Sequence, residues 1–247
     1  MRSGGAGASL RVLEEDPDLA AGLEAGEVAA ATQALVAPRA ALEWDSRGHV
    51  WRPPHPRGHL GLLVVEGLLL REVRLLDTYS AELLAHGDLL RPWDIDGELG
   101  LPVPAEICWT ALKPAAVAVL DADFVRRSAA WPPVISNLAS RAVIRAKSMA
   151  LNNAVTNLKQ VQVRLLVLFF HLADRWGRVG VNVITLPLPL THETLAKLVG
   201  AARPSVTTAL GALAERGLLY RDDTTWCLAR SATEVLASMS PDEGTPP

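Results

Sequence analysis

The 247-residue sequence has few cysteines and no long hydrophobic run. Its two cysteines, Cys108 and Cys227, lie far apart, so they provide neither a disulfide framework nor the ligand spacing of a metal site. The longest apolar run, residues 165–170, is too short to span a bilayer. Residues 1–9 lack the apolar segment of a signal peptide. We therefore expect a cytoplasmic protein without disulfides, bound metal or membrane spans.

Catalytic motifs are also missing. Serine, histidine and aspartate residues are scattered without a nucleophile elbow, and there is no Walker loop and no HExxH motif. An iron–sulfur cluster needs about four thiolates, which two cysteines cannot supply. We therefore expect no enzymatic activity, no catalytic residues and no cofactor.

Charge is distributed unequally between the two halves of the chain. Residues 1–123 contain 10 basic and 19 acidic residues, a net charge of −9, whereas residues 124–247 contain 14 and 8, a net charge of +6. Residues 124–173 contain seven basic residues and no acidic one. An acidic half joined to a basic half is typical of a sensor attached to a nucleic-acid-binding module, although single basic residues can also be the solvated face of a helix.

Residues 190–210 have the spacing of a helix-turn-helix motif. Thr191 is a good N-cap for a first helix, which Gly200 can end in the left-handed conformation. Pro204 suits the first turn of a second helix. That helix would bury Val206, Ala209, Leu210 and Leu213. It would expose Arg203, Ser205, Thr207 and Thr208 near its start.

A small β wing is expected after these two helices. Residues 218–228 predict a strand, a turn at residues 221–224 and a second strand. In a helix-turn-helix, the N-terminal part of the second helix reaches base edges in the major groove. Double-stranded DNA is therefore the expected partner, and a helical hairpin inside an ordinary soluble core is the alternative.

The N-terminal half favours a β-rich domain. Short apolar runs alternate with Gly, Pro and Asp between about residues 40 and 120, which suggests a barrel or jelly roll. The expected strands are residues 59–65, 68–75, 80–84, 107–112 and 116–120, with turns at residues 66–67, 76–77 and 86–88. Residues 19–35 predict one helix or two short helical pieces, and residues 124–128 a short helix.

A long stretch without glycine follows Pro132 and Pro133 and extends to about residue 160. Apolar residues recur along one stripe of it, so we expect a helix of about 25 residues, about 40 Å long. Such a stripe needs a partner, and a second copy of the same helix is the simplest one; the alternative is packing against the β domain. The expected dimer-interface residues are Ile135, Leu138, Ala142, Ala146 and Met149. Residues 161–175 predict a further buried helix that ends at Gly177.

A β-rich domain, a long helix and a winged helix-turn-helix, in this order, resemble the Crp/Fnr family of transcription regulators over roughly residues 40–230. The most specific matches are Leu190-Thr191, Leu195-Ala196, Val199-Gly200, Arg203, Val206, Leu210, Leu213 and residues 215–218. The resemblance implies a homodimer, joined along the long helix, that binds a two-fold symmetric operator. It implies RNA polymerase as a further partner.

The resemblance also implies a set of DNA-binding residues. Four of them would contact bases or nearby phosphates: Arg203, Ser205, Thr207 and Thr208. Thr191 and His192 would lie near the DNA backbone, and Arg221 would contact DNA from the wing.

Two positions depart from the family pattern. Members often carry an acidic residue directly after the leading arginine and a second arginine four residues further on, where this chain has Pro204 and Thr208. An acceptor for cytosine and a bidentate guanine contact are therefore missing, so the operator is expected to differ from the family's best-known palindrome. Arg203 remains the candidate for a guanine or phosphate contact; otherwise it is a helix-surface charge.

The sensor half also departs from the cyclic-nucleotide-binding members, which hold the phosphate with a short helix and a nearby Arg-Ser or Arg-Thr. Residues 97–101 look like the start of that cassette, but their spacing is too long. Glu106 and Ile107 occupy the Arg-Ser positions, and a carboxylate there would repel a phosphate. We therefore expect no cyclic nucleotide, while an unidentified small effector stays open.

The expected fold class is α+β. It comprises a disordered tail (1–20), a cyclic-nucleotide-binding-like β-barrel domain (21–127), a dimerisation helix (128–160), a winged helix-turn-helix domain (161–237) and a second tail (238–247). The expected function is that of a sequence-specific, homodimeric transcription regulator. A protein-interaction scaffold is an alternative, because residues 191–230 contain five basic and four acidic residues. A further alternative is a ligand-binding regulatory subunit of an enzyme, and the expected barrel is the only feature in its favour.

Overall fold

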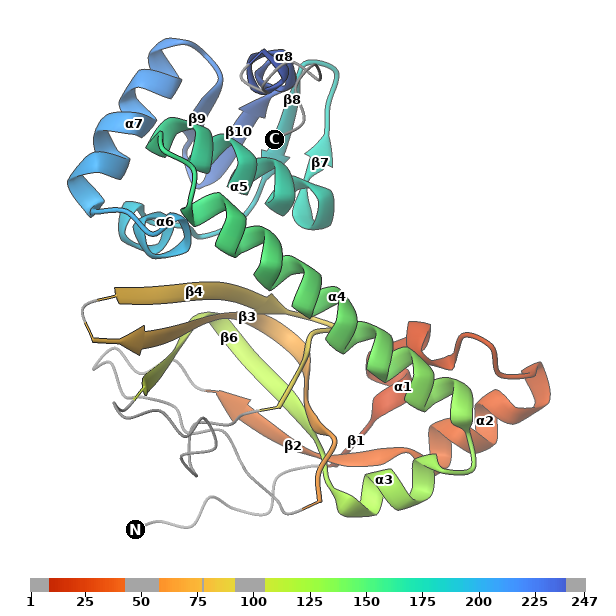
Figure 1. Ribbon diagram of the computed structural model, residues 1–247. Helices are drawn as coiled ribbons and strands as arrows, with labels where there is room; N and C mark the ends of the chain where they lie inside the picture. Colours follow the sequence, from red (N-terminus) through yellow and green to blue (C-terminus); the bar gives the residue numbers. More distant parts are fainter. Residues whose placement is uncertain (1–8, 43–57, 77, 92–104, 239–247) are drawn as a thin grey trace, which may run out of the picture. The chain divides into compact units, whose positions relative to one another are not determined.

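The computed structural model describes residues 9–42, 58–76, 78–91 and 105–238 (Figure 1). The chain divides into two compact units, Met1–Met149 and Ala150–Pro247. The boundary falls within α4 (Pro132–Thr156), so this helix contributes residues to both units.

The N-terminal unit is built on an antiparallel sheet of six strands in the order β1-β2-β6-β3-β4, with β5 paired to β3. They are β1 (Ser9–Arg11), β2 (Val36–Leu42), β3 (Gly61–Leu75), β4 (Thr78–Ala85), β5 (Leu89–Leu90) and β6 (Ala105–Leu120). Along β3, Leu63 and Val65 belong to one apolar cluster, and Leu62 and Val64 to another. Because successive side chains of a strand point to opposite faces, both faces of the sheet are buried here.

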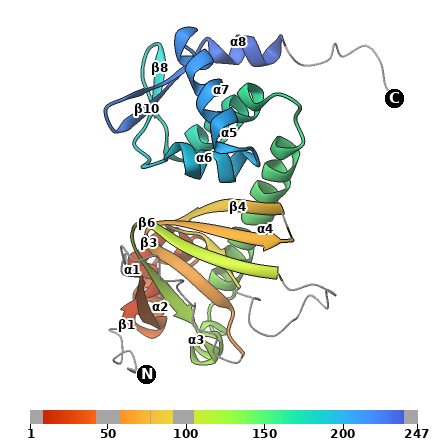
Figure 2. The same ribbon diagram turned by 90° about the vertical axis from the view of Figure 1, so that its left-hand side faces the viewer.

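This arrangement confirms the predicted mixture of helices and a jelly-roll-like sheet. The described strands form no closed barrel, and β3, β4 and β6 lie side by side in both ribbon views (Figure 1, Figure 2). Residues 97–101, which resemble a phosphate-binding cassette, lie outside the described residues.

The two longest strands correct the predicted strand boundaries. The sequence predicts two strands and a turn at residues 66–67, but β3 continues through this point, and β6 likewise joins two predicted strands. The pairing of β3 with β6 shifts in register around Glu66 and Leu68, which marks a β-bulge. Gly67 has φ +89°, and a Cβ atom there would lie 2.2 Å from the carbonyl oxygen of Pro114. The glycine therefore allows two strands to stay paired through a kink, rather than ending them.

The N-terminal segment also differs from the prediction. Residues 9–20 were expected in a disordered tail, but they form β1, α1 (Val12–Glu15) and the 3-10 helix η1 (Pro17–Ala20). The reason is burial: Leu10, Val12, Leu13 and Leu19 are all part of the core cluster. A second helical piece, α2 (Ala25–Ala34), follows, so of the two alternatives predicted for residues 19–35 the structure has two short helical pieces rather than one helix.

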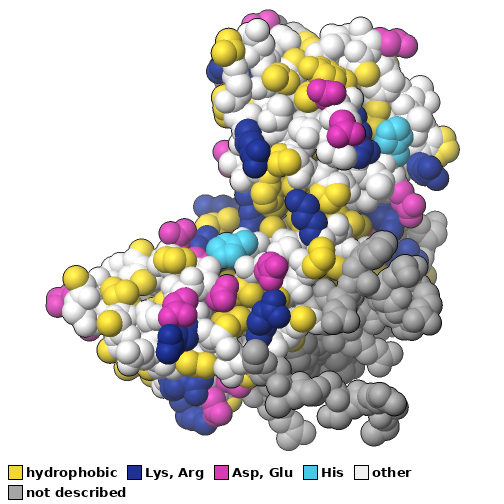
Figure 3. Space-filling view, turned by 180° about the vertical axis from the view of Figure 1, so that it is seen from behind, with side chains coloured by type: hydrophobic (Ala, Val, Ile, Leu, Met, Phe, Trp, Pro, Cys, Tyr) yellow, Lys and Arg dark blue, Asp and Glu magenta, His cyan; other side chains and the backbone are white. Residues whose placement is uncertain are grey.

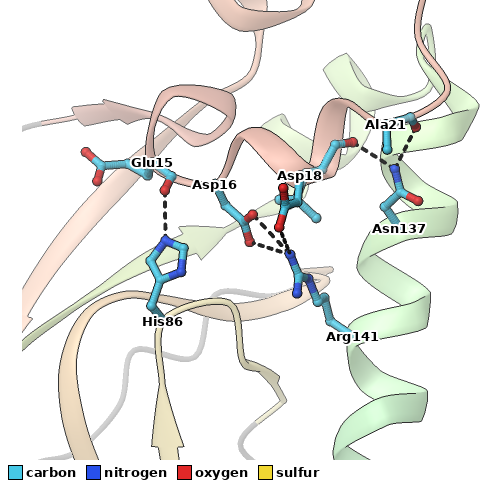
Figure 4. Close-up of polar contacts among 8 residues, drawn as sticks. Glu15, Asp16, Asp18, Ala21, His86, Asn137 and Arg141 are labelled. Carbon is cyan, nitrogen blue, oxygen red and sulfur yellow. Dashed lines mark hydrogen bonds and ion pairs between the residues drawn. The ribbon is translucent and has the colours of Figure 1, made fainter. Parts of the chain in front are cut away.

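Polar contacts attach this segment to the rest of the unit (Figure 4). Arg141 of α4 donates to both carboxylate oxygens of the buried Asp16, at 3.1 and 3.2 Å. The amide of Asn137, one turn earlier, donates to the carbonyl oxygens of Leu19 and Ala21. The ring of His86 contacts the carbonyl oxygen of Glu15 at 2.8 Å. Residues more than a hundred positions apart are thereby joined around one face of α4.

The predicted long helix is present as α4, preceded by α3 (Ala122–Ser128) with Asp121 as its N-cap. Val134 and Leu138 of α4 are fully buried in the core that also contains Phe124. Leu138 was predicted to lie in a dimer interface, and this is wrong, because a side chain that is 0% exposed in one copy offers no surface to a second. One face of α4 therefore packs on its own domain.

A buried ion cluster continues that face of the helix. Arg145 donates to Glu82 of β4 through Nε at 3.1 Å and Nη2 at 2.7 Å, and Arg71 of β3 donates to the same carboxylate at 2.8 Å. The Arg71 guanidinium also lies 5.6 Å from the ring centroid of Trp109. Removing one partner of a buried ion pair costs about 3–5 kcal/mol, because the other charge is left uncompensated. The cluster therefore fixes the position of α4 along the sheet.

The C-terminal unit contains a helical group and a four-stranded sheet of order β7-β8-β10-β9 (Figure 2). Its helices are α5 (Val161–Trp176), α6 (His192–Val199), α7 (Arg203–Glu215) and α8 (Ala232–Ala237). Its strands are β7 (Arg178–Val179), β8 (Val183–Leu186), β9 (Leu219–Asp222) and β10 (Thr225–Ala229). The predicted buried helix ending at Gly177, the two helices after it and the two wing strands are thus confirmed.

We predict that Gly67→Ala lowers the free energy of unfolding of the N-terminal unit by about 3 kcal/mol or more, since the new Cβ meets backbone at a positive φ. Gly26→Ala is the matched control: it lies in α2 with open space around its Cβ, and should raise stability by up to about 1 kcal/mol. Urea unfolding followed by circular dichroism measures both, and equal midpoints for the two variants would contradict the bulge.

Candidate nucleic-acid interface

The first helix of the predicted DNA-binding motif is capped at both ends as the sequence indicates. The Thr191 hydroxyl accepts a hydrogen bond from the Thr194 N–H at 3.1 Å. Gly200 has φ 61° and ψ 47°, the left-handed conformation that ends a helix, and the next N–H, of Ala201, donates back to Ala196 at 3.0 Å. The apolar face of α6, which includes Leu195, Leu198 and Val199, is buried. These contacts fix where the chain turns toward the next helix.

The second helix, α7, separates buried and exposed residues as predicted. Val206, Ala209, Leu210 and Leu213 are buried. Four polar residues at its N-terminal end are exposed: Arg203, Ser205, Thr207 and Thr208. Pro204 lies in the first turn, where no backbone donor is required. The first two turns of α7 therefore present one guanidinium and three hydroxyl groups to solvent.

Trp226 of β10 connects the wing to α5 and to the start of α6. Its indole is 2% exposed, donates to the carbonyl oxygen of Leu190 at 3.2 Å and packs against Phe169 of α5 at a centroid distance of 5.1 Å. The Arg221 guanidinium lies 5.8 Å and the His192 ring 6.4 Å from this indole. Thus Arg221 on the wing and His192 on α6 are brought together over one buried side chain, although they are far apart in sequence.

Arg164 is a structural residue of the motif that the sequence analysis missed. Its Nη1 donates to the carbonyl oxygens of Val199 at 3.1 Å and Gly200 at 3.0 Å, and its Nε donates to Leu158 at 2.6 Å. The guanidinium therefore binds carbonyls at the C-terminal end of α6, where a cation is favoured by the helix dipole. Only its place in the run of basic residues 124–173 distinguished it in the sequence.

A groove lies beside the start of α7 and provides two further candidate residues. It has a volume of about 570 Å³ and is lined by Gln160, Val161, Gln162, Pro204, Ser205, Thr208 and Ala209. The glutamine amides can each donate and accept hydrogen bonds, as required for contacts with phosphates or base edges. Two glutamines at the start of a buried helix gave no signal in the sequence.

Charge on the face of the molecule seen from behind is mixed rather than concentrated (Figure 3). In the view from behind, Lys and Arg side chains lie in small groups between acidic and apolar ones (Figure 3). On α6 the single lysine, Lys197, lies 3.7 Å from Glu193. Binding of a polyanion through this unit would therefore depend on individually positioned groups, not on one large basic patch.

Two groups of this unit have shifted pKa values, and both shifts favour the uncharged form. Burial lowers the pKa of His171 on α5, an effect that Asp174 opposes and Arg175 supports. Burial raises the pKa of the Cys227 thiol, as does the Asp222 carboxylate, against a hydrogen bond with Tyr220. Near neutral pH, neither residue supplies a charge to the surface.

Other kinds of site receive no support within the described ranges 9–42, 58–76, 78–91 and 105–238. These residues include no group of three or more His, Cys, Asp or Glu side chains that could hold a metal ion. None of the helices in the described part of the chain is long and apolar enough to cross a membrane.

The remaining predicted dimer-interface residues lie on the outer side of α4. Ala142, Ala146 and Met149 are exposed, and Ile135 is half-buried. Val143, which the sequence analysis did not include, is 55% exposed and lies beside them on the helix. An apolar strip along α4 is thus left uncovered in the single chain.

Two helices joined by a left-handed glycine and followed by a two-stranded wing define a winged helix-turn-helix domain. Residues 163–230 match the family model of the Crp-like helix-turn-helix domain. A CRP-like cAMP-activated global transcriptional regulator of Mycobacterium tuberculosis is 30% identical over 132 residues, which are 52% of this chain and 59% of that protein. The regulatory protein CysR of Synechococcus elongatus is 30% identical over 73 residues, 28% of this chain and 35% of that one. The chain therefore spans less than two thirds of these relatives.

Solved structures share the fold of the whole chain at low identity. A CooA mutant from Carboxydothermus hydrogenoformans has a TM-score of 0.64 at 17% identity, covering 83% of this chain and 88% of its own. FixK2 from Bradyrhizobium japonicum has a TM-score of 0.60 at 16% identity, covering 82% and 97%. The predicted resemblance is supported: residues 163–230 are a Crp-like helix-turn-helix domain, and the chain is similar to Crp/Fnr regulators in sequence and fold.

We predict that Arg164→Met lowers the free energy of unfolding of the C-terminal unit by about 1–2 kcal/mol, because three carbonyl oxygens lose a charged donor that is only partly buried. Lys159→Met removes a positive charge from an exposed position nearby and should leave stability within about 0.5 kcal/mol. Hydrogen exchange of the α6 amides would report the loss locally. Unchanged protection in Arg164→Met would refute the capping role.

Proposed function

We propose that the chain is a DNA-binding transcription regulator that inserts α7 into the major groove of its operator. The observation that supports this most strongly is the exposed polar start of α7 on a motif fixed by buried contacts. In helix-turn-helix proteins this part of the second helix contacts base edges. Helices in the major groove read bases through such side chains, and the wing and first helix contact the backbone.

The side chains suggest a division of contacts. Arg203 can bind O6 and N7 of a guanine with two hydrogen bonds. Phosphate oxygens can accept hydrogen bonds from Thr191, His192 and Arg221. Gln160 and Gln162, across the groove, can donate to phosphates in the same way. Pro204 and Thr208 replace the charged residues common in the family, so most base contacts of α7 would come from hydroxyl groups.

We further propose that two copies associate along α4. An apolar strip lies beside the face of α4 that packs on the N-terminal unit, and it consists of Ile135, Ala142, Val143, Ala146 and Met149. Small residues allow two helices to approach closely, and apolar side chains between them would be removed from water. A two-fold symmetric pair would present one α7 to each half of a two-fold symmetric operator.

The N-terminal unit is proposed as a sensor-like domain that does not bind cyclic nucleotide. The Mycobacterium tuberculosis relative is named as cAMP-activated, but here Glu106 lies exposed on β6 where a phosphate-binding arginine would be expected. A different small effector, and RNA polymerase as a partner, remain part of the proposal, as do a cytoplasmic location and the absence of catalysis.

The direct test is selection of bound fragments from a genomic DNA pool by the full chain at several salt concentrations. Enrichment of a two-fold symmetric site, with affinity falling steeply as salt rises, supports the proposal. If the chain instead binds a protein stoichiometrically and enriches no DNA, the scaffold function is supported. The observation in favour of that alternative is the mixed charge on the surface seen from behind (Figure 3).

For Arg203→Ala we predict a loss of about 1–3 kcal/mol in binding to the selected operator, with relaxed preference at one position per half-site. Arg216→Ala is the control, because this arginine is exposed at the opposite end of α7 and should change affinity little. Competition binding with operators altered at single positions measures the effect. If affinity falls evenly for all sequences, Arg203 contacts phosphate rather than a base.

For Ala146→Glu we predict at least about a hundredfold weaker self-association, since a carboxylate would be buried without a partner in the apolar strip. Ser140→Glu adds the same charge at an exposed position of α4 outside that strip and should leave self-association unchanged. Sedimentation equilibrium distinguishes the two. Equal association constants would exclude α4 as the interface.

A further inference from the structure

A hydrogen bond links the two helices of the DNA-binding motif at the surface. Nδ1 of His192, the first residue of α6, lies 3.0 Å from Oγ1 of Thr207 on α7. Thr207 is exposed one residue after the buried Val206, on the part of α7 proposed to face DNA. The partner of the Thr207 hydroxyl is therefore a side chain that can either donate or accept.

Neighbouring contacts hold this pair in place. The His192 ring lies beside Trp226, whose indole is anchored to the carbonyl oxygen of Leu190. Thr207 follows the core of α7 and precedes Ala209 and Leu210, which are also buried. Buried neighbours therefore restrict the movement of both partners: Trp226 restricts His192 on α6, and the core residues of α7 restrict Thr207.

The direction of this hydrogen bond decides what Thr207 offers to a ligand. A hydroxyl has one proton to donate and two lone pairs to accept with. When Nδ1 carries no proton, the Thr207 hydroxyl donates to it, and only its lone pairs face outward. When the imidazole is protonated, both ring nitrogens are donors, Nδ1 donates to Oγ1, and the hydroxyl proton is free to point away.

We infer that His192 is a specificity-determining residue, which sets whether Thr207 reads the operator as a hydrogen-bond acceptor or as a donor. The inference rests on the proposed DNA-binding function. In the uncharged tautomer that carries its proton on Nε2, Nδ1 is the acceptor, and Thr207 would favour a base with a major-groove amino group, adenine or cytosine. In the charged state, it would favour a base with an acceptor oxygen, guanine or thymine. Because protonation of the ring makes Nδ1 a donor, base preference at this position depends on pH.

Charged groups of both signs lie on the elements around the ring. Those on α6 are Glu193 and Lys197; α7 carries Arg203, β9 carries Arg221 and Asp222, and α5 carries Arg164. The ratio of affinities for two bases, rather than the affinity itself, separates the role of His192 from the general attraction of cations to DNA.

The experiment uses the full chain and duplexes of its selected operator that differ at one base pair per half-site. The measured quantity is the ratio of the affinity for an amino-bearing base to that for an oxygen-bearing base at one position. Between about pH 8 and about pH 5.5 this ratio should change about fivefold, because one net hydrogen bond contributes about this factor. Thr207→Val keeps the shape but removes the hydroxyl, and should abolish this change. Thr207→Ser should retain it.

Two histidine variants define the role of the ring. His192→Arg provides a permanent donor and should show the low-pH preference at both pH values. His171→Gln is the matched control, because this second histidine of the unit lies on α5 and should leave the pH response intact. Equal melting temperatures of the variants would exclude unfolding as the cause.

The outcomes separate this inference from the function on which it rests. Operator binding with a preference that does not change with pH, or that still changes in Thr207→Val, overturns the role of His192 and leaves the proposed function standing. Failure of the wild-type chain to select any DNA at either pH overturns both.

Discussion

The buried indole of Trp226 is the contact on which the geometry of the DNA-binding motif depends. It takes part in a hydrogen bond to the segment before α6, a ring contact with α5, and contacts beneath His192 and Arg221. A helix-turn-helix is too small to hold its own angle, so its helices must be fixed by neighbours. Here one wing residue makes those contacts. The wing is therefore part of the support of the motif, as well as a candidate DNA contact.

Helix α4 has one face that packs on the N-terminal unit and another that is left uncovered in the single chain. One face carries Val134, Leu138, Arg141 and Arg145, which insert into the core or bind Asp16 and Glu82. The other carries small and apolar residues with no cover in the single chain. The ion pairs cannot slide along the sheet without leaving a buried charge unpaired. The position of the apolar strip is thus determined by the polar contacts on the adjoining face of the same helix.

The sequence was most informative where one local signal decides the structure. Thr191 and Gly200 predict both ends of α6, and Pro204 predicts the start of α7, because capping and φ preferences act within a few residues. It was misleading at Gly67, where a glycine between two apolar runs has the same pattern in a turn and in a bulge. Which one forms depends on β6, about fifty residues away.

Contacts between residues far apart in the sequence could not be predicted from local sequence patterns either. Leu138 falls on the same stripe as Ala142 and Ala146, and only the packed structure separates the buried residue from the exposed ones. Residues 9–20 looked like a polar tail, since their few leucines and valines become significant only once α2, α4 and β2 are in place around them. Arg164 and His192 act through carbonyl and hydroxyl partners 35 and 15 positions away.

The composition of the α7 surface has a consequence for recognition. Arginine and glutamate have fixed hydrogen-bond roles, so a helix that carries them specifies its bases by itself. Ser205, Thr207 and Thr208 can each donate or accept, and their selectivity depends on which role a neighbour leaves to them. Replacing charged readers by hydroxyls transfers part of the specificity from the helix to its surroundings. For Thr207 that neighbour is His192, and for Ser205 and Thr208 the adjoining groove contains two glutamines, which can also take either role. The DNA sequence chosen by such a surface would be determined by the supporting residues as much as by the exposed ones.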